Sequence, residues 1–405
     1  MKRIVRREQI PALFFVLLLY IPAINYFIAD ILVNDLGRPS LSVPFYVLLS
    51  VVGFLSFFYI DKINKKVVVI ALLLGFLTIV STVLYPEILP YLLADNKNPQ
   101  ESDAIMLFLY SVPAMILGNY TVRKSKWDDV IYFFKPLSLF LTIIGICSYI
   151  LTVLINGHYL DYEYMSFSYF MLPGVVYTIL IGATERRFVY LIAGLVGFVI
   201  ILVGGSRGAL VCAVLAFIIS VFQCRKVKKM IYLIAGAVVA LFIVINSFDS
   251  FSEIAQDYMT KHDAYSRNLA KIEDGSMTYS EGREVITNYL KVAIADNPLG
   301  YGLFGDRHVL IPKSYLYSHS IIYEFMVDFG VFLGPLFLLV LFVLTFRRLF
   351  KYPPKESNVI LVLVCCGLLK LIFSGTYLTE IFFWALVGVI IERVPHINSY
   401  EKKSL

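Results

Sequence analysis

Three side chains of this sequence stand in contexts that suit the binding of an anion and the removal of a proton. Arg207 ends the run Gly204-Gly205-Ser206-Arg207, Arg283 follows a glycine, and His319 precedes a serine. Arginine presents a planar fork of N–H donors that matches phosphate oxygens. The turn around Ser206 leaves backbone amides open to an anion, and a neutral imidazole can act as a general base. These types of residue predict a site that holds an anion beside a base.

Each of the three residues also has a plain structural interpretation. Arg207 could simply extend its charge toward the headgroups at a membrane surface, as long basic side chains do. Arg283 is equally typical of a solvated helix face, and His319 of a helix cap or an interface position. Both interpretations stay open on the residues alone.

Aromatic and basic residues of the same region extend the candidate set. Tyr301 lies in the run Asn297-Pro298-Leu299-Gly300-Tyr301-Gly302, and Tyr317 lies just before His319. Their rings suit sugar faces, although the membrane interface attracts tyrosines as well. Arg307 is flanked by glycine turns and has the same two interpretations as Arg283. We expect Ser206, Tyr301, Arg307 and Tyr317 to contact substrate.

Two acidic residues follow the histidine. Glu324 and Asp328 have i, i+4 spacing, so they share one face of a helix. An ionised side chain costs about 3 kcal/mol at the centre of a membrane helix, and such residues usually point inward to a function or a partner. They could orient His319, pair with an arginine or line a proton path. Glu324 joins the predicted substrate contacts.

The elements that must position these residues are membrane helices. The chain is 59% hydrophobic and 16% charged, with a mean hydropathy of +0.78, whereas globular proteins carry about 25% charged residues. Runs long enough to cross a bilayer as helix recur along the chain. Twelve are predicted, at 10–29, 41–60, 67–85, 104–120, 131–155, 166–183, 188–204, 208–223, 230–246, 319–346, 358–374 and 376–392. The sequence predicts an all-α polytopic membrane protein with about 12 transmembrane helices.

The basic residues predict how these helices are oriented. Lysine and arginine cluster in every second connection, for example at 62–66, 123–126 and 225–229, and such connections stay cytoplasmic. Both termini are therefore expected in the cytoplasm, and one large, partly helical loop outside. The predicted layout has helices 1–9 in 1–246, the outer loop in 247–318, helices 10–12 in 319–392 and a cytoplasmic tail in 393–405.

Several other classes of function find no support. The net charge of +6 follows from the basic cytoplasmic connections and needs no nucleic-acid partner. The five cysteines lie in or beside predicted spans, which argues against a disulfide framework or a cysteine metal site. Walker A, His-Glu-x-x-His and Gly-x-Ser-x-Gly motifs do not occur in the sequence, nor does Asp-x-Asp in the outer loop. We expect no metal site.

Together these motifs resemble the O-antigen ligase/polymerase superfamily, which includes the Wzy-type polysaccharide polymerases. Gly-Gly-Ser-Arg207-Gly is similar to the family's turn between two spans, and Gly282-Arg283 followed by the 297–302 run is similar to its outer-loop pattern. His319-Ser320 and the later Gly330 match its histidine motif. The chain departs from the extended form of that motif at Leu333, where the family often has Gly, Thr or Tyr. Because the extended form is the better marker of a ligase, the departure weakens a ligase assignment slightly.

The resemblance implies catalysis by Arg207, Arg283 and His319 on a glycan carried by polyprenyl pyrophosphate, at the outer face of the bacterial cytoplasmic membrane. The arginines would stabilise the pyrophosphate that leaves. His319 would deprotonate the acceptor hydroxyl as it attacks the anomeric carbon with inversion. No cofactor is expected, because the lipid-linked donor is already activated. The implied partners are lipid-linked oligosaccharides and the bilayer, with flippase and chain-length regulator proteins as further candidates.

Three functions remain in view from the sequence. The leading one is a polymerase of O-antigen, capsule or exopolysaccharide, which moves the growing chain onto a new lipid-linked repeat unit. The second is a ligase that transfers finished glycan to a lipid or protein acceptor. The third is a transporter of lipid-linked oligosaccharide, which the clustering of intramembrane charge near one mouth of the bundle disfavours.

Overall fold

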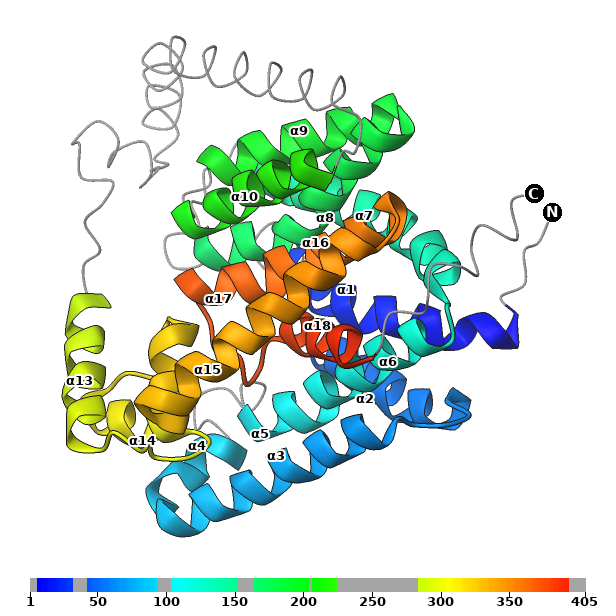
Figure 1. Ribbon diagram of the computed structural model, residues 1–405. Helices are drawn as coiled ribbons and strands as arrows, with labels where there is room; N and C mark the ends of the chain where they lie inside the picture. Colours follow the sequence, from blue (N-terminus) through cyan, green and yellow to red (C-terminus); the bar gives the residue numbers. More distant parts are fainter. Residues whose placement is uncertain are drawn as a thin grey trace, which may run out of the picture. The chain divides into compact units, whose positions relative to one another are not determined.

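A computed structural model describes residues 6–31, 42–93, 103–151, 164–203, 206–223 and 283–392, and every regular element among them is helical (Figure 1). The longer helices are α1 (Ile10–Asp30), α2 (Ser42–Ser56), α3 (Lys65–Leu84), α6 (Val112–Arg123), α7 (Trp127–Tyr149), α8 (Tyr164–Glu185), α9 (Phe188–Val203), α10 (Arg207–Gln223), α13 (Arg283–Asp296), α15 (Ile321–Lys351), α16 (Pro354–Leu363) and α18 (Ile381–Ile391). The shorter elements used below are η4 (Pro86–Ile88), α5 (Asp103–Ile105), α14 (Gly305–Leu310) and α17 (Lys370–Phe373).

The predicted spans agree with the helices. Within the described residues, seven apolar helices are long enough to cross a membrane, and four shorter ones also coincide with predicted spans. The predicted span at 230–246 lies outside the described residues, as does the part of the predicted outer loop at 247–282. The fold class is therefore confirmed: the chain is an all-α, multi-pass membrane protein.

The chain divides into two compact units, each with closely packed helices. The first unit comprises 1–19, 48–133 and 280–405, and the second comprises 20–47 and 134–279. In the first, α6 packs against α18, where a Cβ added to Gly388 would lie 2.0 Å from the carbonyl oxygen of Met115. In the second, α8 packs against α9, where a Cβ on Gly194 would lie 2.4 Å from Ile179 Cγ1. Small residues at such crossings are what allow membrane helices to approach closely.

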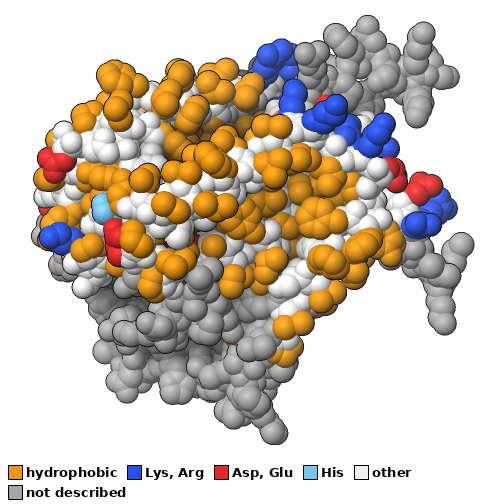
Figure 2. All heavy atoms as spheres, turned by 90° about the horizontal axis from the view of Figure 1, so that it is seen from below, with side chains coloured by type: hydrophobic (Ala, Val, Ile, Leu, Met, Phe, Trp, Pro, Cys, Tyr) orange, Lys and Arg blue, Asp and Glu red, His pale blue; other side chains and the backbone are white. Residues whose placement is uncertain are grey.

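Apolar side chains cover much of the surface, as expected of helices that face lipid. On α3 the side chains of Leu72 and Val83 are 68% and 74% exposed. Figure 2 shows hydrophobic side chains across the middle of one face, with Lys and Arg side chains gathered toward one end of it. This distribution fits a membrane-crossing surface.

The segment from α13 to α15 carries the C-terminal half of the predicted motifs. Helix α13 ends at Asp296, because the residue before Pro298 disfavours helical backbone. Asn297 Nδ2 then donates to the carbonyl of Gly300 at 2.8 Å and closes the turn. Helix α14 follows the turn, and an irregular segment leads to His319 and the start of α15.

The turn at 297–302 docks on a kink in α15. The kink is at Gly330 (φ 82°, ψ 171°), so the N–H of Val331 donates to Pro298 O instead of continuing the helix. The N–H of Tyr301 in turn donates to Val327 O at 2.8 Å. A Cβ on Gly300 would lie 2.5 Å from Gly330 N. The two glycine motifs are thus two sides of one backbone contact, which positions α14 beside the first turns of α15.

Candidate active site

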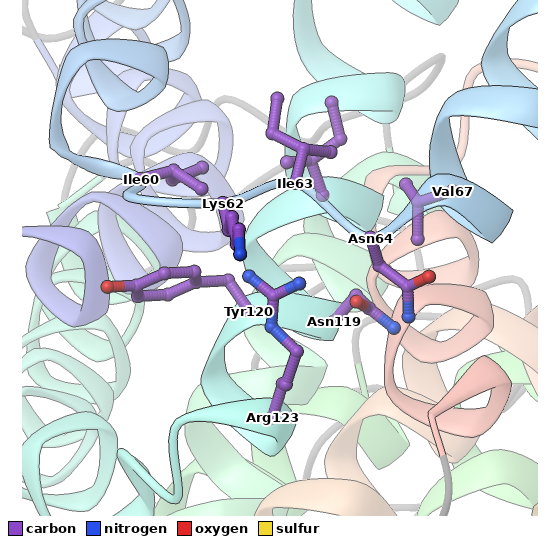
Figure 3. A pocket seen from close by; sticks show the side chains of 9 residues that line it. Ile60, Lys62, Ile63, Asn64, Val67, Asn119, Tyr120 and Arg123 are labelled. Atoms are coloured by element: carbon purple, nitrogen blue, oxygen red, sulfur yellow. The ribbon is translucent and has the colours of Figure 1, made fainter.

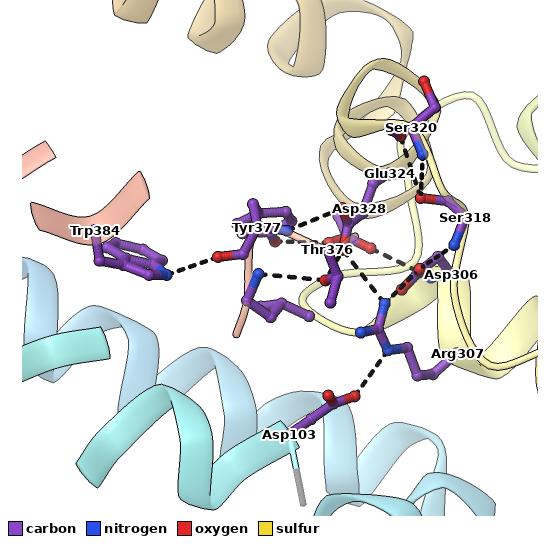
Figure 4. A network of polar contacts seen from close by, with 11 residues as sticks. Asp103, Asp306, Arg307, Ser318, Ser320, Glu324, Asp328, Thr376, Tyr377 and Trp384 are labelled. Atoms are coloured by element: carbon purple, nitrogen blue, oxygen red, sulfur yellow. Dashed lines mark hydrogen bonds and ion pairs between the residues drawn. The ribbon is translucent and has the colours of Figure 1, made fainter. Parts of the chain in front are cut away.

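Arg307 is at the centre of a buried polar network in the first unit (Figure 4). Its Nε donates to Asp103 Oδ2 at 2.9 Å, and its Nη1 donates to Asp306 Oδ2 at 2.5 Å and to Glu324 Oε1 at 3.3 Å. The Arg307 side chain is 2% exposed, and those of Asp306 and Glu324 are 0% exposed. Among the alternatives for Glu324, pairing with an arginine is therefore the one that the structure shows.

The segment between α17 and α18 closes the other side of this network. Thr376 Oγ1 donates to Glu324 Oε1, and Tyr377 N donates to Glu324 Oε2 at 3.2 Å. Tyr377 OH donates to Asp328 Oδ2 at 2.7 Å, while Asp328 Oδ1 accepts from the Asp306 N–H at 3.3 Å. Trp384 Nε1 donates to the Tyr377 carbonyl at 2.8 Å. Both acids on the shared face of α15 thus point into the protein and are satisfied by protein donors.

The network holds more acid than base. One arginine faces four carboxyl groups, those of Asp103, Asp306, Glu324 and Asp328. Burial raises the pKa of Asp306, and the neighbouring Arg307 opposes that rise. Burial alone would lower the pKa of Arg307, but Asp103, Asp306 and Glu324 outweigh it and raise that pKa. Arg307 therefore stays positively charged, and the surrounding carboxyl groups compete for its N–H donors.

The network holds the turn that carries His319. Asp306 Oδ2 accepts from the backbone N–H of Ser318 at 3.2 Å, and Ser318 Oγ donates to the Ser320 carbonyl at 3.1 Å. His319 itself has a φ of 57°, in the left-handed region that non-glycine residues seldom adopt. Such strain persists only where the surroundings impose it, and it is frequent at functional sites.

The His319 imidazole has an unusual environment. Its Nδ1 is buried and has no hydrogen-bond partner among the described residues. The ring of Tyr317 lies beside it, with the centroids 4.2 Å apart, and the Arg307 guanidinium lies 6.0 Å from the Tyr317 ring. Burial, and then the positive charges of Arg283 and Arg307, lower the pKa of His319 to about 4. The imidazole is therefore neutral at neutral pH and can accept a proton.

Arg283 lies close enough to His319 for its charge to act on the imidazole. It is the first residue of α13, a helix of 14 residues, and its side chain is half-buried. Arg283 thus places a cationic side chain near the histidine, and its planar fork of N–H donors suits an anion.

Ser206 and Arg207 belong to the second unit. Ser206 is 2% exposed, and its Oγ accepts from the Ala209 N–H at 3.3 Å, so it caps α10. Arg207 is the first residue of α10 and is half-buried. The two glycines expected to form an anion-binding turn, Gly204 and Gly205, lie outside the described residues.

The structure brings some of the predicted residues together and places others apart. Arg307, Tyr317, His319 and Glu324 form one connected group, and Arg283 acts on it through its charge. Tyr301 lies in a different cluster, with its ring centroid 5.5 Å from that of His308.

The sequence analysis missed several members of the network, among them Asp103, Asp306, Thr376 and Tyr377. Asp306 had a signal, since it stands directly before an arginine between glycine turns. Asp103 and Tyr377 had none, because they come from segments far along the chain from Arg307.

The membrane span that begins at Asp103 differs in charge between its two ends. It runs from Asp103, which binds Arg307, to Arg123. A shallow pocket at that far end is lined by Lys62, Asn64, Asn119 and Arg123, among others (Figure 3). Basic groups thus occupy one end of this span and the acid-rich network the other, which agrees with the predicted alternation of basic connections.

Comparison with known proteins bears on these motifs directly. A family model described as O-antigen ligase matches residues 189–338. The matched segment contains Arg207, Arg283, Arg307 and His319, together with the turn and the kink that dock on each other. The search of curated proteins gave no match. Through residues 189–338 the chain is therefore similar to the O-antigen ligase family, which agrees with the resemblance seen in its motifs.

Proposed function

We propose that the protein is a polysaccharide polymerase that joins oligosaccharide repeat units carried on polyprenyl pyrophosphate, at the extracytoplasmic face of the bacterial cytoplasmic membrane. The observation that carries the proposal is the His319 imidazole: it is neutral, its buried Nδ1 has no partner among the described residues, and a charged network fixes its turn. A neutral imidazole can take the proton of a hydroxyl group, and a bound pyrophosphate raises its pKa toward the range that suits a base at neutral pH.

In the proposed reaction the acceptor hydroxyl attacks the anomeric carbon of the donor sugar. A new carbon–oxygen bond forms there as the bond to the pyrophosphate oxygen breaks, so the configuration is inverted. The hydroxyl proton passes to His319, and the electron pair of the broken bond stays on polyprenyl pyrophosphate. Arg283 on α13 is assigned the stabilisation of that anion through charge-assisted hydrogen bonds, and the sequence motif makes Arg207 on α10 a second candidate for this role.

The exposure of the remaining predicted residues separates those that position the site from those that can contact substrate. Arg307 and Glu324 are 2% and 0% exposed, and protein groups bind them. We assign them the positioning of the His319 turn in place of direct contact with substrate. Tyr317, half-exposed beside His319, remains a candidate sugar contact. Ser206 acts through the cap that it forms on α10, which orients Arg207.

A ligase is the second candidate, because the matching family model is described as O-antigen ligase. The departure of the histidine motif at Leu333 favours the polymerase. Both functions use the same bond-making step and differ in the acceptor, so the acceptor decides between them.

The test supplies purified full-length protein with lipid-linked repeat units taken from cells that lack polymerase activity. A polymerase lengthens the lipid-linked glycan and releases one polyprenyl pyrophosphate for each unit added. If glycan instead moves only when a separate acceptor, such as a lipid core oligosaccharide, is added, the protein is a ligase.

A further inference from the structure

Four side chains outside the His319 site form a second, half-exposed cluster in the first unit. The rings of Tyr85 and His308 are stacked, with centroids 4.0 Å apart and an interplanar angle of 28°. Tyr301 lies against both, with its centroid 6.2 Å from that of Tyr85 and 5.5 Å from that of His308. Glu87 Oε1 lies 2.5 Å from His308 Nδ1. We call these four residues the aromatic–acid cluster.

The cluster combines ring faces with hydrogen-bonding groups that remain reachable. The side chains of His308 and Glu87 are 30% and 46% exposed. A hydrogen bond from its own backbone amide, and then the one from His308, lower the pKa of Glu87, so it is a carboxylate that only accepts. His308 Nδ1 is therefore the donor in their bond. His308 then retains Nε2, and Glu87 retains its second carboxylate oxygen, for hydrogen bonds to a ligand.

The position of the cluster follows from the same backbone that builds the His319 site. Tyr85 ends α3, and Glu87 lies in η4 directly after it. Gly302 packs close to Ser81 of α3, which holds the turn bearing Tyr301 against the end of that helix. On α14, Asp306 and Arg307 enter the buried network while the next residue, His308, enters the cluster. One short helix therefore joins the two sites.

The chemistry of the cluster selects a ligand. Aromatic faces pack on the apolar C–H faces of sugar rings, and carboxylate and imidazole acceptors suit sugar hydroxyl groups. The Glu87 carboxylate disfavours a phosphate group. The arginines of the other site favour one.

We propose that Tyr85, Glu87, Tyr301 and His308 form a subsite for an uncharged sugar residue of the glycan. This inference rests on the proposed function for the identity of the glycan. It assigns a sugar of the substrate to the side of α14 that carries His308, apart from the pyrophosphate that Arg283 is proposed to bind.

The test measures binding without transfer. The repeat-unit oligosaccharide, released from its lipid by mild acid, is titrated into full-length protein in detergent and followed by saturation-transfer NMR. Tyr85→Leu and His308→Ala should each weaken binding by about fivefold or more, because ring stacking and hydrogen bonds are lost. Tyr85→Phe should retain most of the affinity, since the ring is kept.

Tyr289→Leu is the matched control. Tyr289 is a loop-side tyrosine of the same unit, whose ring lies 6.2 Å from that of Tyr315 and outside the cluster. It should bind like the wild type. Equal affinity of the wild type, Tyr85→Leu and His308→Ala, or no binding by the wild type, would overturn the subsite. Binding that depends on the cluster in a protein that transfers no sugar would reject the proposed enzymatic function and leave the subsite standing.

Discussion

Asp306 and Ser318 are joined by a hydrogen bond from the Ser318 backbone N–H to Asp306 Oδ2, at 3.2 Å. The same oxygen accepts from Arg307 Nη1 at 2.5 Å. One buried carboxylate oxygen thus links the arginine-centred network to the turn before His319. The left-handed backbone of His319 (φ 57°) is held by this link rather than by a glycine. We infer that the network determines where the imidazole lies.

The first prediction tests that positioning role. Asp306→Ala removes the acceptor of the Ser318 N–H and should lower kcat by about tenfold to a hundredfold, because a small misplacement of a catalytic group is costly. KM should stay nearly unchanged. Steady-state kinetics on purified protein give both values. Asp103→Asn is the control: it changes a peripheral partner of Arg307 that is 18% exposed, so its effect on kcat should be small. A fall in protein level with normal kcat would show that Asp306 serves folding alone.

The second prediction concerns pH. His319 has a pKa of about 4 against an ordinary value of 6.5, partly because of the charge of Arg283. A base must be unprotonated, so kcat/KM should stay level as pH falls from 7 and drop only near pH 4. In Arg283→Gln the pKa of His319 should rise, and the residual activity should begin to fall at a higher pH. A bound pyrophosphate should raise the same pKa, because it offsets the arginine charges. An unchanged midpoint in Arg283→Gln would contradict the electrostatic link.

The third prediction concerns the docked turn. Gly330→Ala places a Cβ 2.5 Å from Pro298 O on backbone with φ 82°. The strain and the steric conflict together should destabilise the protein by roughly 1–3 kcal/mol. Thermal unfolding in detergent should show a lower midpoint. Gly75→Ala, in the interior of α3 with no neighbouring atom within 4 Å, should leave the midpoint unchanged or raise it. Equal midpoints for Gly330→Ala and the wild type would contradict the contact.

The fourth prediction tests the orientation. Leu299, 82% exposed in the turn before Tyr301, should lie outside the cell, and Asp61, in the basic connection before α3, should lie inside. In a cysteine-free background, an impermeant thiol reagent should label Leu299→Cys in intact cells and Asp61→Cys only after lysis. The reverse pattern would place the site in the cytoplasm and exclude the proposed reaction there.

The sequence predicted the membrane helices well, because composition and run length determine them. Long apolar runs such as those of α3 and α15 are visible without any knowledge of contacts. The end of α13 before Pro298 is likewise a local property, because the residue before a proline disfavours helical backbone.

The network could not be predicted, because its members come from distant segments. In the sequence, nothing distinguishes Arg307 from the other arginines of the outer loop. Its ion pairs with Asp103 and Glu324 are visible only in the structure. The need for glycine at Gly300 and Gly330 could not be predicted either, since a Cβ at each position would meet backbone of the segment that docks on it. The residue type of Arg307 allowed both a substrate contact and a structural role. Its burial in the structure favours the structural role.

The central claim is tested most directly by the lipid-linked glycans of cells that carry His319→Ala. Loss of the base should reduce transfer by about a hundredfold or more, while the protein still accumulates in the membrane. For a polymerase, single repeat units on polyprenyl pyrophosphate should accumulate at the outer face, and polymer should disappear. Extracted glycolipids, sized on a gel and probed for sidedness, give the answer. Long glycan still attached to polyprenyl pyrophosphate, or single units facing the cytoplasm, would contradict the polymerase and indicate a ligase or a transporter instead.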